Sequence, residues 1–132
     1  MTDWLERRDV DYNYKFLMAQ HGGPKGPPDE DALAATLARP QQLLAYEPES
    51  NLFELAASYG YGFARNHCFP DGNKRIALAA MDIFLMLNNV DLVPDEAEAV
   101  VIVNEIAADE LSQEDLASWL EQNSRPLDPD DV

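Results

Sequence analysis

The sequence has a single cysteine, no uninterrupted apolar run of membrane-spanning length and few basic residues. Because Cys68 stands alone, the chain cannot form an internal disulfide or a zinc site built from several cysteines, which fits a reducing compartment. The richest apolar stretch, Ile76 to Leu87, is interrupted by Asp82 and falls short of the ~20 residues that span a bilayer. The first residues lack the basic and apolar regions of a signal peptide. We therefore expect a cytoplasmic protein without a membrane partner.

Basic residues are scarce, since nine Lys and Arg stand against 25 Asp and Glu in 132 residues, a formal charge of −16. Such a surface repels phosphate backbones and anionic lipid, so we expect neither nucleic acid nor a membrane as the main partner. The excess is greatest in residues 91–132, which hold 13 acidic residues and one basic residue. Between residues 41 and 109 the basic residues are Arg65, Lys74 and Arg75, and this clustering predicts an anion-binding site.

Helical periodicity and capping signals run through the sequence and predict an all-α fold. Asn51 with Glu54, and Ser112 with Asp115, have the spacing of helix N-terminal caps. Predicted helices begin after Asp9 or Asp11, after Asp29, at Asn51 (ending near Asn66), near Gly72 (ending at Asn88-Asn89), at Pro94 and at Ser112. The helix that starts near Gly72 is apolar all round, which is typical of a central, buried helix.

Proline residues and one β-branched run affect where these helices end and whether one segment is helical. Pro40 should end the second helix, because the residue before a proline disfavours the helical conformation. The Pro24–Pro28 stretch predicts a rigid loop. Val100–Val103 is compatible with a strand, although the apolar spacing that continues to Ile106 favours a helix. We expect a single domain over residues 1–123 and a disordered tail over residues 124–132.

The junction between the two long helices, Arg-Asn-His-Cys-Phe-Pro-Asp-Gly-Asn-Lys-Arg from Arg65 to Arg75, contains the parts of a phosphoryl- or nucleotidyl-transfer site. Gly72 and Asn73 open a helix, whose free N–H groups and positive dipole end attract anions. Lys74 and Arg75 add full positive charge beside them.

Two further residues of this junction suit the chemistry of such a transfer. Asp71 offers the hard oxygen that Mg²⁺ uses together with substrate phosphates. His67 has the pKa range of a general base for an attacking hydroxyl, although a lone histidine at a helix end is usually structural. Arg65 is open to two interpretations, a phosphate contact or an ion pair with one of the many carboxylates.

The residues from His67 to Arg75 match His-x-Phe-x-(Asp/Glu)-Gly-Asn-x-Arg, and the chain resembles the Fic/Doc superfamily over roughly residues 10–120. Lys74 resembles the death-on-curing (Doc) branch. The resemblance implies a compact Fic-type helical bundle, with a central buried helix after the loop. By position it implies His67 as general base, Asp71 as Mg²⁺ ligand, Gly72-Asn73 as anion cradle and Arg75 as phosphate clamp. Phe69 is implied as the core anchor that fixes this loop.

The resemblance also implies a function, namely a toxin of a type II toxin–antitoxin system that transfers phosphate from ATP to a host protein. Translation elongation factor Tu is the target by resemblance, and a separate antitoxin is the expected inhibitor. One alternative is AMP transfer, which is disfavoured because Lys74 replaces the usual glycine of AMP-transferring relatives. A second alternative is a catalytically silent binding module. Tyr14 and Pro28 stand where many Doc-like sequences have His and Arg.

Overall fold

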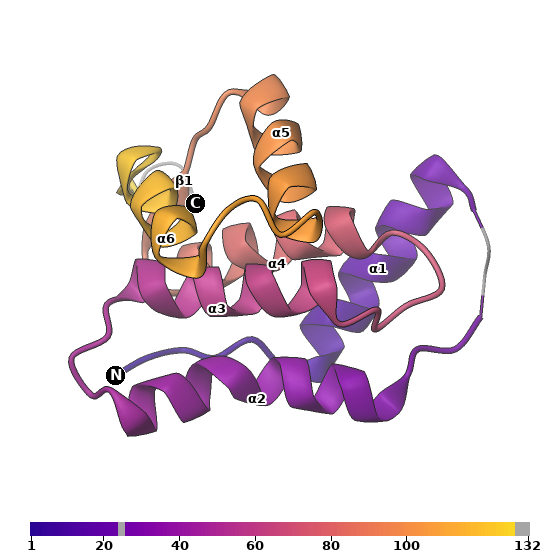
Figure 1. Cartoon of the computed structure of the whole chain (residues 1–132), viewed down its shortest axis with the longest axis horizontal. Coiled ribbons are helices and arrows are strands. Elements are labelled where there is room, and N and C mark those ends of the chain that lie inside the picture. The colour runs from indigo at the N-terminus through magenta and orange to yellow at the C-terminus, as the bar shows by residue number, and fades with distance from the viewer. Residues whose placement is uncertain (24–25, 129–132) are drawn as a thin grey trace.

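The computed structural model describes residues 1–23 and 26–128, and these form six helices and two short strands (Figure 1). Their bounds are α1 Arg7–His21, α2 Glu30–Tyr46, α3 Leu52–Arg65, α4 Asn73–Leu87, β1 Val90–Leu92, α5 Glu96–Ala107, α6 Gln113–Gln122 and β2 Ser124–Pro126. The all-α prediction is confirmed. No helix in this described part is long and apolar enough to cross a membrane.

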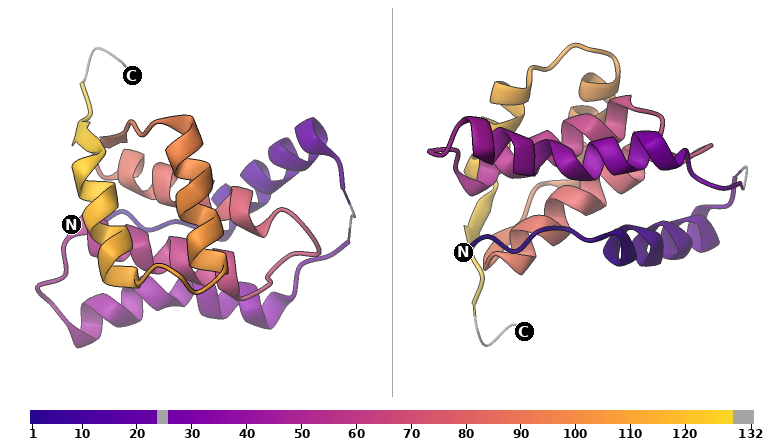
Figure 2. Two further views of the ribbon diagram at one scale, coloured as in Figure 1. Left: turned by 45° about the horizontal axis from the view of Figure 1, so that its top comes forward. Right: turned by 90° about the horizontal axis from the view of Figure 1, so that it is seen from below.

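Helices α3 and α4 run antiparallel through the middle of the molecule, with α2 beside α3 and both α5 and α6 on the opposite side (Figures 1 and 2). Every residue of α3 from Leu55 to Gly60 is buried, because α2, α4, α5 and α6 all pack on this helix. Helix α4 is buried where it faces α3, whereas Met86 and Leu87 near its end are exposed. The antiparallel pair places the loop between α3 and α4 at one end of the core.

The capping signals predicted from the sequence set the helix starts. The Asn51 side chain accepts from Glu54 N at 2.9 Å and the Glu54 carboxylate accepts from Asn51 N, a complete capping box. Ser112 Oγ likewise accepts from Asp115 N at 3.1 Å. The segment around Val100 lies in α5 and is helical, as its spacing indicated.

Three boundary predictions are wrong. Helix α2 continues through Pro40, because the proline is buried against the core and Leu43 and Leu44 beyond it also pack there. Helix α1 begins at Arg7 with Glu6 as its N-cap, and the predicted cap residue Asp9 lies inside the first turn, where its carboxylate accepts from Glu6 N at 2.9 Å.

The third wrong prediction is that a disordered tail begins at residue 124. Ser124–Pro126 form β2, which pairs antiparallel with β1. Residues 129–132 of that tail, and residues 24–25 of the predicted Pro24–Pro28 loop, lie outside the described residues.

Candidate functional site

The loop between α3 and α4 is fixed to the start of α4 by the side chain of Asn73. Its Oδ1 accepts from Phe69 N at 3.1 Å, and its Nδ2 donates to Phe69 O at 2.9 Å. The Phe69 ring is buried in the core, with 5% of its surface exposed. Asn73 therefore closes the loop in one conformation and leaves the first N–H groups of α4 open at its end.

Tyr14 of α1 supports the same loop from the other side. Its ring stacks on Phe69 with ring centroids 3.9 Å apart, and its hydroxyl donates to Asp71 O at 3.0 Å. Burial raises the pKa of Tyr14, and so does the nearby charge of Asp71, which keeps the hydroxyl a hydrogen-bond donor at neutral pH. The backbone of Asp71 is thus set by a residue 57 positions earlier.

Position 72, the N-cap of α4, requires glycine because its φ of +80° lies in the left-handed region. A Cβ there would also lie 3.1 Å from the sulfur of Met18. Gly23, with φ of +116°, approaches the Asp71 carboxylate so closely that a Cβ would collide with it. The α1 end therefore packs directly against the loop that carries the motif.

Helix α2 holds the beginning of the loop. Asn66 Nδ2 donates to Thr36 Oγ1 at 2.8 Å, and this hydroxyl lies 3.4 Å from Cys68 Sγ. Asp29 N donates to Cys68 O at 2.8 Å. Burial raises the pKa of the Cys68 thiol, so it stays protonated and serves packing rather than nucleophilic chemistry.

A pocket of about 780 Å³ opens over this loop, a size typical of small-molecule sites. Its lining includes the predicted site residues His67, Asp71, Gly72, Asn73, Lys74, Arg75 and Arg65. His67 is exposed, and its φ of +50° is a strained backbone conformation for a non-glycine residue. Strained conformations of this kind cluster at functional sites. The geometry thus brings all seven residues to one cavity.

The cations of this pocket differ in their pairing. Within the described chain no carboxylate lies at ion-pair distance from Lys74 or Arg75, although acidic residues far outnumber basic ones. Arg65, in contrast, forms a 2.7 Å ion pair with Asp109 and stacks on the Tyr61 ring. The structure therefore places Arg65 in the ion pair that the sequence allowed, and leaves Lys74 and Arg75 with positive charge available for an anion.

One wall of the pocket was missed by sequence reasoning. Helix α5 contributes Val100, Val103, Asn104 and Ala107, which are mostly apolar and face the motif across the cavity. Nothing in the motif identifies this wall, because it depends on how α5 packs on α3 and α4.

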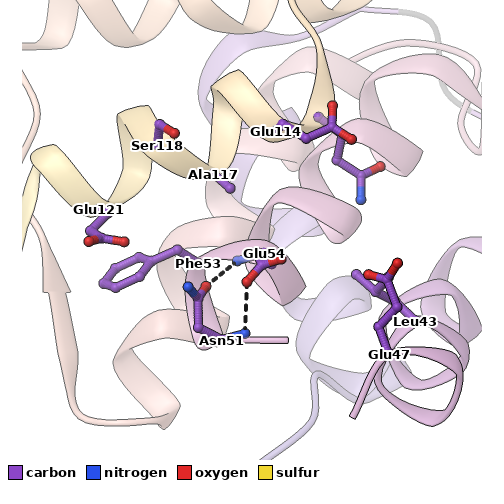
Figure 3. Close-up of a pocket in the computed structure, with 10 residues that line it drawn as sticks. Leu43, Glu47, Asn51, Phe53, Glu54, Glu114, Ala117, Ser118 and Glu121 are labelled. Carbon is purple, nitrogen blue, oxygen red and sulfur yellow. Dashed lines mark hydrogen bonds between the residues drawn. The ribbon is translucent and has the colours of Figure 1, made fainter. Parts of the chain in front are cut away.

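A different hollow of about 310 Å³, shown in Figure 3, lies between the end of α2, the start of α3 and α6. It is lined by four glutamates, Glu47, Glu54, Glu114 and Glu121, and contains none of the motif residues. Because carboxylates repel phosphate, this hollow is not a nucleotide site.

Asp71 is the carboxylate that suits a divalent cation in the motif pocket. No cluster of three or more His, Cys, Asp or Glu side chains able to hold a metal occurs in residues 1–23 and 26–128. Mg²⁺ does not need such a cluster, since one carboxylate together with substrate phosphates is a common binding mode. A single acidic side chain beside an anion cradle fits that donor set.

Comparison with known proteins agrees with this arrangement. The Fic/DOC family model matches residues 4–85. "Protein kinase doc" of Escherichia phage P1 is 35% identical over 103 residues, which cover 78% of this chain and 81% of that protein. "Toxin Doc" of Mycolicibacterium smegmatis is 34% identical over 123 residues, which cover 91% of this chain and 92% of the relative. The chain therefore belongs to the Fic/DOC family.

Proposed function

We propose that the protein is a Doc-type toxin that transfers the terminal phosphate of ATP to a hydroxyl of another protein. The observation that carries this proposal is the positive charge of Lys74 and Arg75 at the open end of α4, with which no carboxylate of the described residues pairs. In a chain of charge −16, two cations that no described carboxylate neutralises, beside a helix N-terminus, indicate an anionic ligand. A relative that carries the name protein kinase supports the choice of phosphate transfer.

The residues of the loop take separate roles in this reaction. His67 removes the proton of the acceptor hydroxyl, whose oxygen forms a bond to the γ-phosphorus while the bond to the β–γ bridging oxygen breaks and ADP leaves. The N–H groups after Gly72, with Arg75, hold the phosphate oxygens and offset their charge. Asp71 would hold Mg²⁺, which supplies further charge neutralisation when bound.

The two walls of the pocket, which has a volume of about 780 Å³, differ in their chemistry. The apolar α5 wall, with Val103 and Ala107, offers a surface for the uncharged part of the nucleotide. The motif at the opposite wall holds the phosphates, so ATP spans the cavity.

The partners follow from the family. We propose a separate antitoxin as the inhibitor, in a type II toxin–antitoxin pair, because a relative is named toxin Doc. We propose a cytoplasmic host protein as the acceptor, with translation elongation factor Tu as the first protein to test.

The first experiment distinguishes phosphate transfer from AMP transfer. The purified protein is incubated with ATP, Mg²⁺ and elongation factor Tu, or with a cell lysate, and the acceptor is identified by intact mass. A phosphate-sized increase is expected, whereas an AMP-sized increase would replace the proposal with AMP transfer. No modified protein in either mixture would favour a silent binding module.

The base is tested with the two histidines of the chain. His67→Ala should slow the transfer by about 10²-fold or more, the usual contribution of a general base. His21→Ala is the matched control, because His21 is an exposed histidine at the end of α1 outside the pocket. Equal rates for the two variants would show that His67 is not the base.

A further inference from the structure

A hollow of about 460 Å³ lies beside the motif pocket, between α4, β1 and the start of α5. Leu78 of α4 and Val100 of α5 line both the hollow and the pocket. Since the two hollows share these wall residues, they lie next to each other, and His67 lines the motif pocket but not the second hollow. We call this second hollow, lined by Leu78, Asp82, Leu92, Val93, Pro94, Glu96, Ala99 and Val100, the α4–α5 groove.

The groove combines exposed apolar side chains with negative charge. Val93 is 47% exposed and Val100 is 54% exposed, so neither side chain is buried in the core. The charged residues that line it are Asp82 and Glu96, and none of its lining residues is basic. This differs from the motif pocket, where Lys74 and Arg75 supply positive charge.

These charges decide which molecule fits the groove. The phosphates of a nucleotide would be repelled by Asp82 and Glu96, so they do not occupy the groove. The surface proposed above for the uncharged part of ATP, at Val103 and Ala107, lies in the motif pocket and outside the groove. A second copy of this chain, with its formal charge of −16, is disfavoured for the same reason. A peptide segment with apolar side chains and a Lys or Arg satisfies both the apolar walls and the carboxylates.

We propose that the α4–α5 groove binds a segment of the acceptor protein in which apolar residues flank a basic one, and so guides the acceptor hydroxyl to His67. This inference rests on the proposed function, because only a protein acceptor needs such a path. The nucleotide phosphates occupy the α4 end of the pocket, and the acceptor enters past Leu78 and Val100 from the other side.

The apolar part of the groove is tested by placing a charge in it. Val93→Glu should raise the KM for the acceptor identified above by about tenfold or more, because an unpaired carboxylate on apolar surface is costly to bury. The affinity for ATP, measured by calorimetry, should not change. Val101→Glu is the matched control, since Val101 is 52% exposed and lines neither the groove nor the motif pocket.

The charged part is tested with two glutamates that each lie in the first turn of a helix. Glu96 and Glu114 both lie in the first turn of a helix, so each Gln variant loses a similar favourable interaction with the helix dipole. Glu96→Gln should raise the acceptor KM several-fold and weaken its dependence on salt. Glu114→Gln, which lies in the separate hollow of Figure 3, should leave both unchanged.

Each other outcome overturns the inference in a recognisable way. An unchanged acceptor KM in Val93→Glu, with transfer intact, would overturn the groove and leave the proposed function standing. A loss of ATP affinity in that variant would place the nucleotide in the groove instead. Weaker antitoxin binding with an unchanged acceptor KM would assign the groove to the antitoxin. An absence of transfer by the unmodified protein would overturn both proposals.

Discussion

At the scale of single residues, side chains outside the motif hold the loop in shape. Tyr14 fixes the backbone of Asp71, and the Asn66–Thr36 hydrogen bond fixes the end of α3. Each of these contacts joins the loop to a different helix. A loop held from α1 and α2 presents the N–H groups of α4 without reorganisation when an anion arrives, which is the arrangement that favours charge stabilisation.

Tyr14→Phe removes the hydroxyl but keeps the stacking on Phe69. We expect a several-fold fall in kcat with little change in KM for ATP, because Asp71 loses its backbone support. The loss of stability should be about 1 kcal/mol, the usual net value of one hydrogen bond. Since the Tyr14 pKa is raised and its hydroxyl remains protonated near neutral pH, the pH profile of kcat should keep its shape.

Tyr12→Phe is the control for this variant, because Tyr12 lies on the same helix and is 74% exposed. A shifted pH profile in Tyr14→Phe would mean that Tyr14 takes part in proton transfer. An unchanged kcat would mean that the loop holds its shape without the hydroxyl.

At the scale of elements, two glycines let α3 approach two of its neighbours, α4 and α2, closely. A Cβ on Gly60 would collide with the side chain of Met81 on α4, and a Cβ on Gly62 would lie 2.9 Å from Thr36 Cγ2 on α2. The Gly-x-Gly pattern of Gly60 and Gly62 in α3 therefore serves close helix packing. Close packing of α3 on α4 sets where the loop between them lies.

Gly60→Ala should destabilise the protein by about 1–3 kcal/mol, the usual cost of overpacking a core. Met81→Ala alone should cost about 2–5 kcal/mol through the cavity that it leaves. In the double variant the two costs should not add, because the new methyl group occupies space that Met81 vacated. Denaturant unfolding of the four proteins measures this coupling, and additive costs would contradict the predicted contact.

The sequence was informative where structure is local and silent where it depends on distant contacts. Capping pairs such as Asn51 with Glu54 located helix starts, and the motif identified one side of the pocket because its residues are nearly contiguous. Strand β2 pairs with β1 across more than thirty residues, and its three residues carry no periodic signal. Helix α2 continues past Pro40, because tertiary burial outweighs a local preference.

At the scale of the whole molecule, the large net negative charge is unfavourable for a pocket suited to an anion. The ion pairs found in the described residues are mostly exposed, and such pairs contribute little stability. Repulsion among the excess carboxylates is therefore not offset by local pairing.

Salt should consequently stabilise the protein. We expect the Tm to rise by a few degrees when NaCl increases from about 10 mM to about 150 mM, because the screening length falls from about 30 Å to about 8 Å. Calorimetry in the two buffers measures the change. A fall in Tm would show that the exposed ion pairs outweigh the repulsion.

The pairing of β1 with β2 also has a consequence for the order in which the protein is completed on the ribosome. Residues 90–92 are made before their partners at 124–126, and at about 5–20 residues per second the delay is roughly 2–7 seconds. Val93 follows β1 directly, and its N–H donates to Asn123 O at 2.8 Å, so it also lacks its partner during this delay. The β1 side of the α4–α5 groove is therefore finished late in synthesis, after the loop between α3 and α4 has been made.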